Sequence, residues 1–328
     1  MTKYQDSNLL SSTKRPFGKI KDMTVPMYSF GGGAISGEGG GYGFGDINEG
    51  KAIELVQYAY DKGVTLFDSA PIYGFGLSEK RIGKALNHIR EKVIYLSKSG
   101  VTWHPNKRVN MTNDPQVAED MVYQSLKDFG TDYIDLYLIH WPDQNVDIRK
   151  PLERLAKLQL EKKIKYIGLC NTNATDLALA SEVCSIDVIQ AEFNLFKREN
   201  FEKIYDPFCK KNNAAFMSWG PIDKGILSGK YNLNRKFDDS DCRKSAPWFK
   251  QADVVKKVEI VEAAKKLLPS GIDFMELVFS YYFNQNINTI LIGAKSMDQF
   301  DDALAKLKVG KDLWTSFEKK EDFLKLFV

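Results

Sequence analysis

The sequence predicts an α/β protein with the architecture of a (β/α)8 barrel. Short apolar runs typical of β-strands alternate with helix-like stretches along the 328 residues of the chain. Eight such runs can be distinguished, and polar residues follow most of them. No linker, low-complexity tract or change of composition divides the chain. Residues 1–328 are therefore expected to form a single domain, with a flexible N-terminal tail at 1–15.

The expected elements begin with a small hairpin at 16–26, ahead of the first strand. The eight strands are expected at 27–30, 64–67, 93–96, 133–139, 165–169, 188–189, 214–217 and 289–292. Alternation of strands with helices demands parallel pairing through right-handed crossovers. Eight units close such a sheet into a TIM barrel, whereas fewer units would leave an open, doubly wound sheet.

The helical spacing of apolar residues defines three of the intervening helices most clearly. One covers 53–60 and stops at Gly63. Another begins after Asp114, an N-cap residue followed by proline at the first helical position, and it ends at Gly130. A third covers 251–268. These helices lie between expected strands, as the barrel requires.

Charge and composition exclude several classes of function. The 46 Lys+Arg and 43 Asp+Glu residues give a net charge of +3, which is too balanced to indicate a nucleic-acid partner. No apolar run approaches the ~18–20 residues of a membrane span. The N-terminus lacks the apolar segment of a secretory signal, and the four cysteines form no CxxC pair, so no metal site is expected. A cytoplasmic location is expected, and the choice between monomer and homo-oligomer stays open.

Four polar residues at strand ends carry the candidate chemistry: Asp68, Tyr73, Lys98 and His140. Each one alone has an ordinary structural interpretation, as a helix cap, a wall residue, a solvated cation or a core imidazole. The mouth of a barrel, however, brings separate strand ends within reach of one another. We therefore expect these four side chains to form one site.

The four residue types suit proton delivery to an oxygen that is gaining negative charge. A tyrosine has a pKa near 10, and a nearby ammonium such as that of Lys98 is expected to lower the pKa of Tyr73. Asp68 would hold the lysine, and His140 would donate a hydrogen bond to a substrate oxygen. Carbonyl reduction is such a reaction, and it needs a hydride from another source.

Five sequence segments, in this order between residues 16 and 310, resemble motifs of the aldo-keto reductase family. They are Gly63–Gly74, Gly76–Leu86, Leu138–Asp143, Ile222–Tyr231 and Ile292–Ser296. The resemblance implies a barrel reductase that uses a nicotinamide cofactor, usually NADPH, and no metal. It implies that Tyr73 is the general acid, that Lys98 and Asp68 support it, and that His140 orients a small-molecule carbonyl substrate.

The resemblance also implies a set of cofactor-binding residues, part of it in a long loop at 220–252. The set is Gly31, Gly32, Gly33, Asp68, Cys170, Asn171, Gln190, Trp219, Gly220, Pro221, Ile222, Gly225, Leu227, Gly293, Lys295, Ser296, Gln299 and Asp302. Cys170 departs from the usual serine. Trp219 is expected to stack on the nicotinamide, although it also fits a buried barrel aromatic. The loop is expected to cover the cofactor.

Lys295 and Ser296 occupy the position where the family holds the 2′-phosphate of NADPH. An ammonium and a hydroxyl suit a phosphate dianion, so NADPH is expected to be preferred. Gln299 replaces an arginine of many NADPH-specific members, and Asp302 precedes an alanine in place of asparagine. The preference is therefore expected to be modest, with NADH usable at lower affinity.

The substrate-binding residues implied are Tyr73, Trp103, His140 and Trp141, although Trp103 equally fits a packed loop residue. Gly33 stands where many family members carry a bulky aromatic side chain, which indicates a wider pocket. The physiological substrate is not identified by these features. One alternative function is a cofactor-binding regulatory subunit of the same fold with little turnover. Another is a barrel aldolase in which Lys98 forms a Schiff base.

Overall fold

Eight parallel strands form a closed barrel in the computed structural model, which describes residues 10–37 and 42–328. Their order around the barrel is β10-β11-β12-β3-β4-β5-β8-β9. The strands are β3 (Tyr28–Gly31), β4 (Leu66–Asp68), β5 (Ile94–Ser99), β8 (Ile134–Ile139), β9 (Ile164–Cys170), β10 (Val188–Glu192), β11 (Ala215–Trp219) and β12 (Thr289–Ile292). The predicted barrel is confirmed, and each observed strand overlaps its predicted position.

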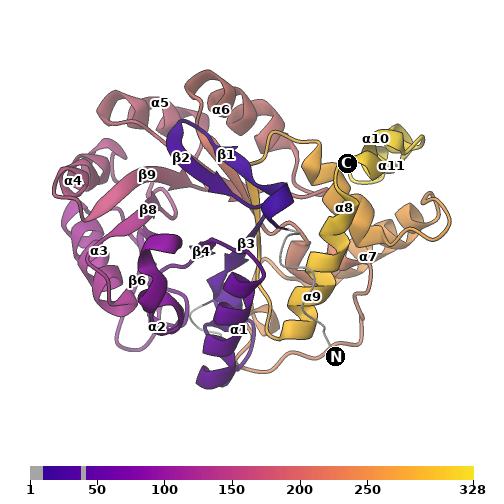
Figure 1. Ribbon diagram of the computed structural model, residues 1–328, viewed down its shortest axis with the longest axis horizontal. Coiled ribbons are helices and arrows are strands. Elements are labelled where there is room, and N and C mark those ends of the chain that lie inside the picture. Colours follow the sequence, from indigo (N-terminus) through magenta and orange to yellow (C-terminus); the bar gives the residue numbers. More distant parts are fainter. Residues whose placement is uncertain (1–9, 38–41) are drawn as a thin grey trace.

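Helices surround the strands, as Figure 1 shows. They are α1 (Glu49–Asp61), α2 (Leu77–Leu86), α3 (Pro115–Phe129), α4 (Arg149–Leu160), α5 (Ala174–Val183), α6 (Asp206–Asn212), α7 (Gln251–Lys265), α8 (Phe274–Phe283), α9 (Met297–Lys306), α10 (Asp312–Ser316) and α11 (Lys320–Lys325). The expected boundaries of α3 are confirmed. The Asp114 side chain accepts hydrogen bonds from two backbone N–H groups of the first turn, and Gly130 ends the helix at φ 68°.

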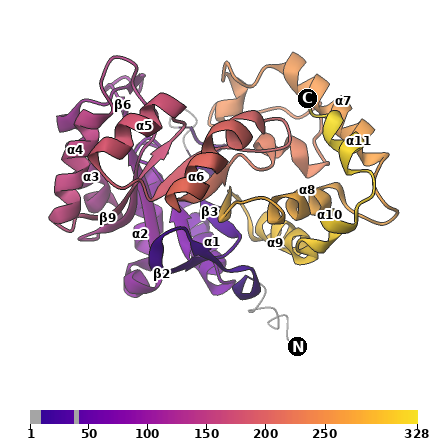
Figure 2. The same cartoon turned by 90° about the horizontal axis from the view of Figure 1, so that it is seen from above.

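The interior of the barrel is filled by side chains that alternate with outward-facing ones along each strand. Leu66, Leu96 and Met217 belong to this inner cluster. The predicted hairpin is present as β1 (Arg15–Phe17) and β2 (Ile20–Val25), and its apolar residues pack against the same cluster. The hairpin thus closes the N-terminal end of the barrel. Figure 2 places β2 and β6 on opposite sides of the molecule.

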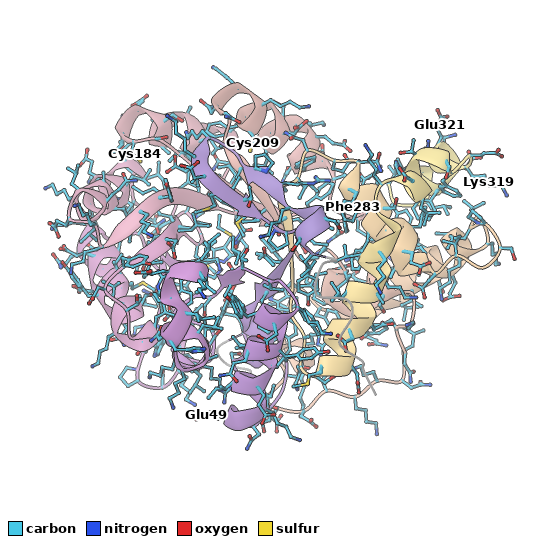
Figure 3. All side chains as sticks on the ribbon, in the orientation of Figure 1. Glu49, Cys184, Cys209, Phe283, Lys319 and Glu321 are labelled. Carbon is cyan, nitrogen blue, oxygen red and sulfur yellow. The ribbon has the colours of Figure 1, made fainter. Side chains whose placement is uncertain are left out.

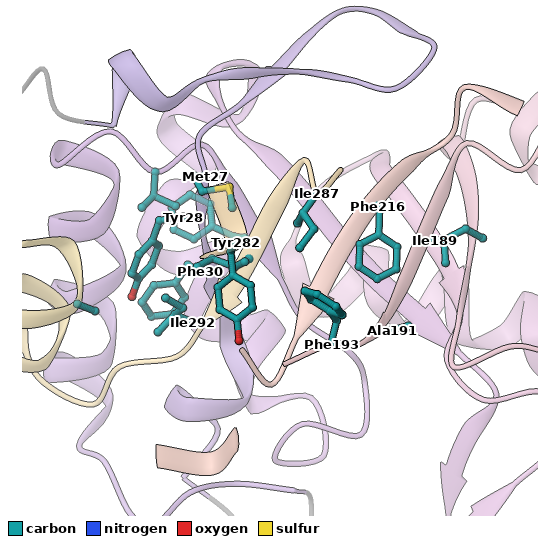
Figure 4. Packing of buried hydrophobic residues seen from close by; sticks show 14 of the residues in the cluster. Met27, Tyr28, Phe30, Ile189, Ala191, Phe193, Phe216, Tyr282, Ile287 and Ile292 are labelled. Atoms are coloured by element: carbon teal, nitrogen blue, oxygen red, sulfur yellow. The ribbon is translucent and has the colours of Figure 1, made fainter. Parts of the chain in front are cut away.

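A second apolar layer lies between the strands and the helices. Phe193 and Phe216 stand with their ring centroids 6.4 Å apart, and Tyr282 of α8 packs beside Phe193 at 5.7 Å. Figure 4 shows these rings together with Tyr28 and Phe30. Charged side chains such as Glu49 and Glu321 lie at the periphery, as Figure 3 shows. None of the helices within 10–37 and 42–328 is long and apolar enough to cross a membrane.

The expectation of a flexible tail at 1–15 needs a correction for its last residues. Residues 1–9 lie outside the described part of the chain. Leu10 is fully buried in the main core, and the Met27 amide donates to Thr13 Oγ1 at 3.2 Å. Arg15 already belongs to β1. This end of the expected tail is packed because burial of Leu10 and the backbone contacts outweigh its freedom.

Two features were not predicted from the sequence. A second hairpin, β6 (Val101–Trp103) and β7 (Val109–Met111), follows β5 at the C-terminal end of the barrel. Helices α10 and α11 extend the chain beyond the barrel. The expected loop at 220–252 is mostly irregular, with short helical turns at Asp223–Ser228 and Cys242–Lys244.

Candidate active site

The pleat of the strands places polar side chains on the inner face at the C-terminal end of the barrel. Asp68 stands two residues after Leu66 in β4, and Lys98 stands two residues after Leu96 in β5. Both leucines belong to the inner cluster. Because side chains two residues apart share one face of a strand, Asp68 and Lys98 point into the same mouth.

Asp68 and Lys98 form a buried ion pair. The Lys98 ammonium is fully buried and donates to Asp68 Oδ1 at 2.6 Å and to the Ser69 carbonyl at 2.8 Å. Gln190 Nε2 donates to the same carboxylate oxygen at 2.9 Å. A buried charge is costly unless it is paired and hydrogen-bonded, and these contacts satisfy both groups.

Tyr73 lies in the turn between β4 and α2, with the Lys98 ammonium 5.0 Å from its ring centroid. Burial raises the pKa of the Tyr73 phenol well above its ordinary value, and the Asp68 carboxylate acts in the same direction. The pKa of Tyr73 is therefore raised overall, against the expectation of a lowered value. Burial is the largest cause of this rise, and the Lys98 ammonium, which is already paired with Asp68, does not offset it.

His140 directly follows β8 and is almost completely buried. Its ring meets that of Tyr73 edge to face, with centroids 5.8 Å apart and an interplanar angle of 84°. Burial lowers the pKa of His140 well below its usual value, and the charge of Lys98 adds to the effect. The imidazole is therefore neutral near pH 7 and can donate a hydrogen bond without carrying charge. The structure thus brings the four predicted residues together.

The residues expected at the nicotinamide end are linked by hydrogen bonds. Trp219 Nε1 donates to Asn171 Oδ1 at 2.9 Å, and Asn171 Nδ2 donates to the His140 carbonyl at 3.1 Å. The Cys170 thiol donates to Gln190 Oε1 at 3.4 Å. The Gln190 side chain is therefore engaged with Cys170 and Asp68. The partly buried ring of Trp219 is held at the mouth by this network.

The glycines expected around the cofactor fall into two groups. At Gly32 a Cβ would lie 2.6 Å from the Asp68 carbonyl oxygen, and at Gly293 it would lie 2.6 Å from Ala34 Cβ. Gly31 approaches the backbone of Gly293 in the same way. Close packing of adjacent strand ends accounts for these positions. At Gly33 the nearest described atom would be 3.8 Å away, so a side chain fits there.

The loop after β11 carries five of the expected residues. Gly220 and Gly225 adopt φ values of 64° and 104°, and the Pro221 carbonyl accepts a hydrogen bond from the Tyr282 hydroxyl. Leu227 is fully buried in the core, while Ile222 is partly buried against it. The Leu227 side chain is therefore part of the core.

The residues expected near the 2′-phosphate lie at the start of α9. Lys295 Nζ donates to the Phe44 carbonyl at 3.1 Å, and the Ser296 side chain caps α9 by accepting from the Gln299 amide at 3.2 Å. Gln299 Oε1 accepts from the Lys295 amide. Asp302 instead forms a surface ion pair with Lys230 at 3.3 Å. Lys295 and Ser296 are thus adjacent, and Asp302 faces another partner.

A further cation near this end was missed from the sequence. Arg243 is buried and forms a two-point ion pair with Asp241, at 2.9 and 2.6 Å. Burial lowers the pKa of Lys295, and the positive charge of the nearby Arg243 lowers it further. No spacing pattern could have identified Arg243, because it comes from the irregular loop before α7.

Aromatic side chains surround Tyr73 at the mouth. Trp103, at the end of β6, meets Phe75 edge to face with centroids 5.2 Å apart. Trp141 stacks beside His140 at 6.3 Å, and Tyr42 packs on the same small cluster. Trp103 and Trp141 thus pack on the same apolar cluster as Tyr73. Phe75 and Tyr42 were not predicted, although Phe75 stands only two residues after Tyr73.

The model of the aldo/keto reductase family matches residues 29–320, which is most of the chain. The chain belongs to the aldo/keto reductase family. Members of this family are oxidoreductases that act on carbonyl and alcohol groups with NAD(P)H. The mouth of the barrel described above is therefore the candidate active site of an aldo/keto reductase.

Curated relatives and solved structures agree with this assignment. Aldo-keto reductase YhdN of Bacillus subtilis is 33% identical over 267 residues, which cover 80% of each chain. The NADH-specific methylglyoxal reductase of Escherichia coli is 27% identical and covers 90% of this reductase and 94% of its own length. The glycerol dehydrogenase AKR11B4 from Gluconobacter oxydans superposes with a TM-score of 0.82, at 28% identity and 97% coverage of both chains.

Proposed function

We propose that this reductase converts an aldehyde or ketone to an alcohol with NADPH, and that Tyr73 is the general acid. The observation that carries the proposal is that the side chains of Tyr73, Lys98 and His140 lie close together at the mouth of the barrel. The Lys98 ammonium lies 5.0 Å from the Tyr73 ring centroid, and the His140 ring lies against the edge of the same phenol. A carbonyl oxygen near Tyr73 and His140 has donors for the negative charge it develops.

The raised pKa of Tyr73 suits a proton donor that must stay protonated until the reaction demands its proton. The phenol keeps its hydrogen while the substrate oxygen is a weakly basic carbonyl. Once that oxygen becomes an alkoxide, it is more basic than phenolate and takes the proton. The Lys98 ammonium then stabilises the phenolate that remains.

His140 orients the substrate in this proposal. A neutral imidazole donates a hydrogen bond to the carbonyl oxygen without competing with Tyr73 as the acid, because the lowered pKa keeps His140 uncharged. Its backbone is fixed on both sides, since its amide donates to the Ser99 carbonyl at 2.8 Å and its carbonyl accepts from Asn171. Trp103 and Trp141 form apolar walls for the rest of the substrate.

The residues present fit a nicotinamide cofactor, which would supply the hydride when bound. Asn171 fixes the partly buried Trp219 ring, on which a flat nicotinamide would stack. The backbone of Gly220, Ile222 and Gly225 would follow the pyrophosphate. The floor of the cofactor site would be formed by closely packed residues, namely Cys170, Gly31, Gly32 and Gly293. Gln190 would act indirectly, by holding the Asp68 carboxylate through its hydrogen bond.

NADPH is the proposed cofactor because Lys295 and Ser296 stand side by side at the start of a ten-residue helix. A helix N-terminus with an ammonium and a hydroxyl suits a phosphate dianion. The E. coli relative is named NADH-specific. Family membership alone therefore does not decide between NADPH and NADH, and the proposed preference rests on Lys295 and Ser296. Gln299 and Asp302 offer no cation, which keeps the proposed preference modest and leaves NADH usable.

The test is a panel of aldehydes and ketones followed by nicotinamide absorbance, with NADPH and NADH, for the wild type and Tyr73→Phe. We expect Tyr73→Phe to lose at least ~10²-fold in turnover, the usual scale of a general acid. Cofactor affinity, measured by quenching of tryptophan fluorescence, should stay unchanged. Undiminished turnover in Tyr73→Phe would remove Tyr73 from the acid role. Cofactor binding with no turnover of any carbonyl would favour the regulatory-subunit alternative.

A further inference from the structure

The turn that carries Tyr73 is tied to the first turn of α2. The Tyr73 amide donates to the Ala70 carbonyl at 3.0 Å, and the Gly76 amide donates to the Pro71 carbonyl at 2.7 Å. The Ser78 amide then donates to the Tyr73 carbonyl at 3.2 Å. The position of the Tyr73 backbone therefore depends on where the start of α2 sits.

Two adjacent side chains fix the start of α2 against the barrel. Ser78 Oγ donates to the Gly32 carbonyl at 3.0 Å and accepts from Ser69 Oγ at 2.8 Å. Glu79 Oε1 accepts from Ser97 Oγ at 2.5 Å. Ser97 immediately precedes Lys98 in β5, and the two side chains point to opposite faces of the strand.

These contacts form a continuous connection between the two sides of the proposed acid. It runs from the Tyr73 carbonyl to Ser78, along the chain to Glu79, and across to Ser97 beside Lys98. Glu79 and Ser97 are both fully buried. Near the start of α2, Glu79 is thus the residue that joins the helix after Tyr73 to the strand that carries Lys98.

A carboxyl group at this place is costly. Glu79 Oε2 has no hydrogen-bond partner among the described residues, and burial of such a group is unfavourable. Packing alone does not require it, since Ile82, Ala85 and Leu86 of the same helix already lie in the core. The hydrogen bond between Ser97 and Glu79 is directional, so it fixes the position of α2 along β5 more strictly than apolar packing does.

We infer that Glu79 is a positioning residue, which acts through Ser97 to set the distance between the Tyr73 phenol and the Lys98 ammonium. The inference rests on the proposed function, because it assigns Glu79 a role in placing that acid. A displacement of about 1 Å in such a site can cost as much as ~10²-fold in rate. Glu79 touches neither the phenol nor the ammonium.

The test compares four variants with the wild type: Ser97→Ala, Glu79→Gln, Glu79→Ala and Tyr73→Phe. Ser29→Ala is the matched control, because Ser29 is a fully buried serine of β3 whose hydroxyl bonds Thr289 Oγ1 at 2.7 Å. For each protein, kcat, the KM for a carbonyl, cofactor affinity and the melting temperature are measured. Glu79→Gln keeps an oxygen that accepts from Ser97, so it is the conservative rescue.

We expect Ser97→Ala and Glu79→Ala to lower kcat by about tenfold or more while cofactor affinity stays unchanged. Glu79→Gln and Ser29→Ala should keep kcat within about threefold of the wild type. Equal kcat for Ser97→Ala and Ser29→Ala would overturn the inference, as would a loss in Glu79→Gln equal to that in Glu79→Ala. If Glu79→Ala does not fold, Ser97→Ala and Glu79→Gln decide. A fully active Tyr73→Phe would overturn the proposed acid itself, and with it this role of Glu79.

Discussion

Lys98 Nζ lies 2.6 Å from Asp68 Oδ1, and the two residues stand on neighbouring strands in a diagonal arrangement. In the register between β4 and β5, Asp68 is opposite Leu96, so Lys98 is two residues further toward the mouth. The long side chain of Lys98 spans this offset. The pair therefore joins the two strands at the level where Tyr73 and His140 meet.

Removal of the ammonium in Lys98→Met should impair both stability and turnover. The change leaves the Asp68 carboxylate buried without its cation, and the loss of one partner of a buried pair costs about 3–5 kcal/mol. Turnover should also fall, because no cation remains to stabilise the Tyr73 phenolate. Urea unfolding and carbonyl reduction measure the two effects.

Lys165→Met is the control for this change. Lys165 also forms a short ion pair, with Asp135 at 2.9 Å, but its side chain is 47% exposed. Lys165 stays largely hydrated, and Arg90 still pairs with Asp135 at 2.7 Å when Lys165 is removed, so this variant should stay close to the wild type. Equal stability of Lys98→Met and Lys165→Met would contradict the view that burial makes the Lys98 pair important. For Asp68→Asn we expect a milder loss of turnover than for Lys98→Met, because Lys98 keeps its place near Tyr73.

The space at Gly33 predicts a change in substrate size preference. In Gly33→Trp the Cβ meets no described atom within 3.8 Å, so the indole can extend toward the mouth. We expect the KM for bulky ketones to rise at least ~tenfold more than that for small aldehydes, because the indole occupies substrate space. Gly33→Ala is the control and should change neither. Equal losses on both substrate classes would point to a displaced cofactor instead.

Lys295→Ala should weaken the preference for NADPH. A hydrogen bond to a charged group contributes ~1.5–3 kcal/mol, so the KM for NADPH should rise at least ~tenfold and that for NADH should barely change. Initial rates with both cofactors measure this. Lys306→Ala, at the other end of α9 and paired with Asp273 at 3.2 Å, is the control. An equal effect on both cofactors would refute the contact between Lys295 and the 2′-phosphate.

Glu79 predicts a pH dependence of stability. Burial raises the pKa of Glu79 from 4.5 to about 7, with Asp128 acting in the same direction, while Ser97, Ser125 and Lys98 lower it; Tyr137 also faces this group. The folded protein therefore binds the proton more tightly than the unfolded chain. Protonation of Glu79 therefore adds to the free energy of unfolding. This contribution, about 3 kcal/mol, is complete below pH 4.5 and is lost as the pH rises through about 7.

Glu79→Gln removes the titrating group and should remove this dependence. Urea unfolding at about pH 5 and about pH 8 should show the wild type losing more free energy of unfolding than the variant. Parallel losses in both proteins would show that other groups control the pH dependence.

Much of the fold could be predicted because strand patterns and helix signals are local. Asp114 caps α3 and Gly130 ends it, whatever the rest of the chain does. The β6–β7 hairpin was missed because its strands are short, and Trp103 alone carries no periodic signal. Leu10 could not be recognised as a core residue, because its partners lie far away in the sequence.

The sequence by itself determined the barrel and predicted that Asp68, Tyr73, Lys98 and His140 meet at its mouth, since strand ends of a closed parallel sheet must converge. Only the tertiary structure decided their electrostatics. Burial raises the pKa of Tyr73 overall, and the nearby Lys98 ammonium, which is paired with Asp68, does not offset this rise. The tertiary structure also decided that Glu79 bonds Ser97, and that Gln190 bonds Asp68. Such effects depend on distances and on exclusion of water, and both arise only when strands far apart in the sequence close around one mouth.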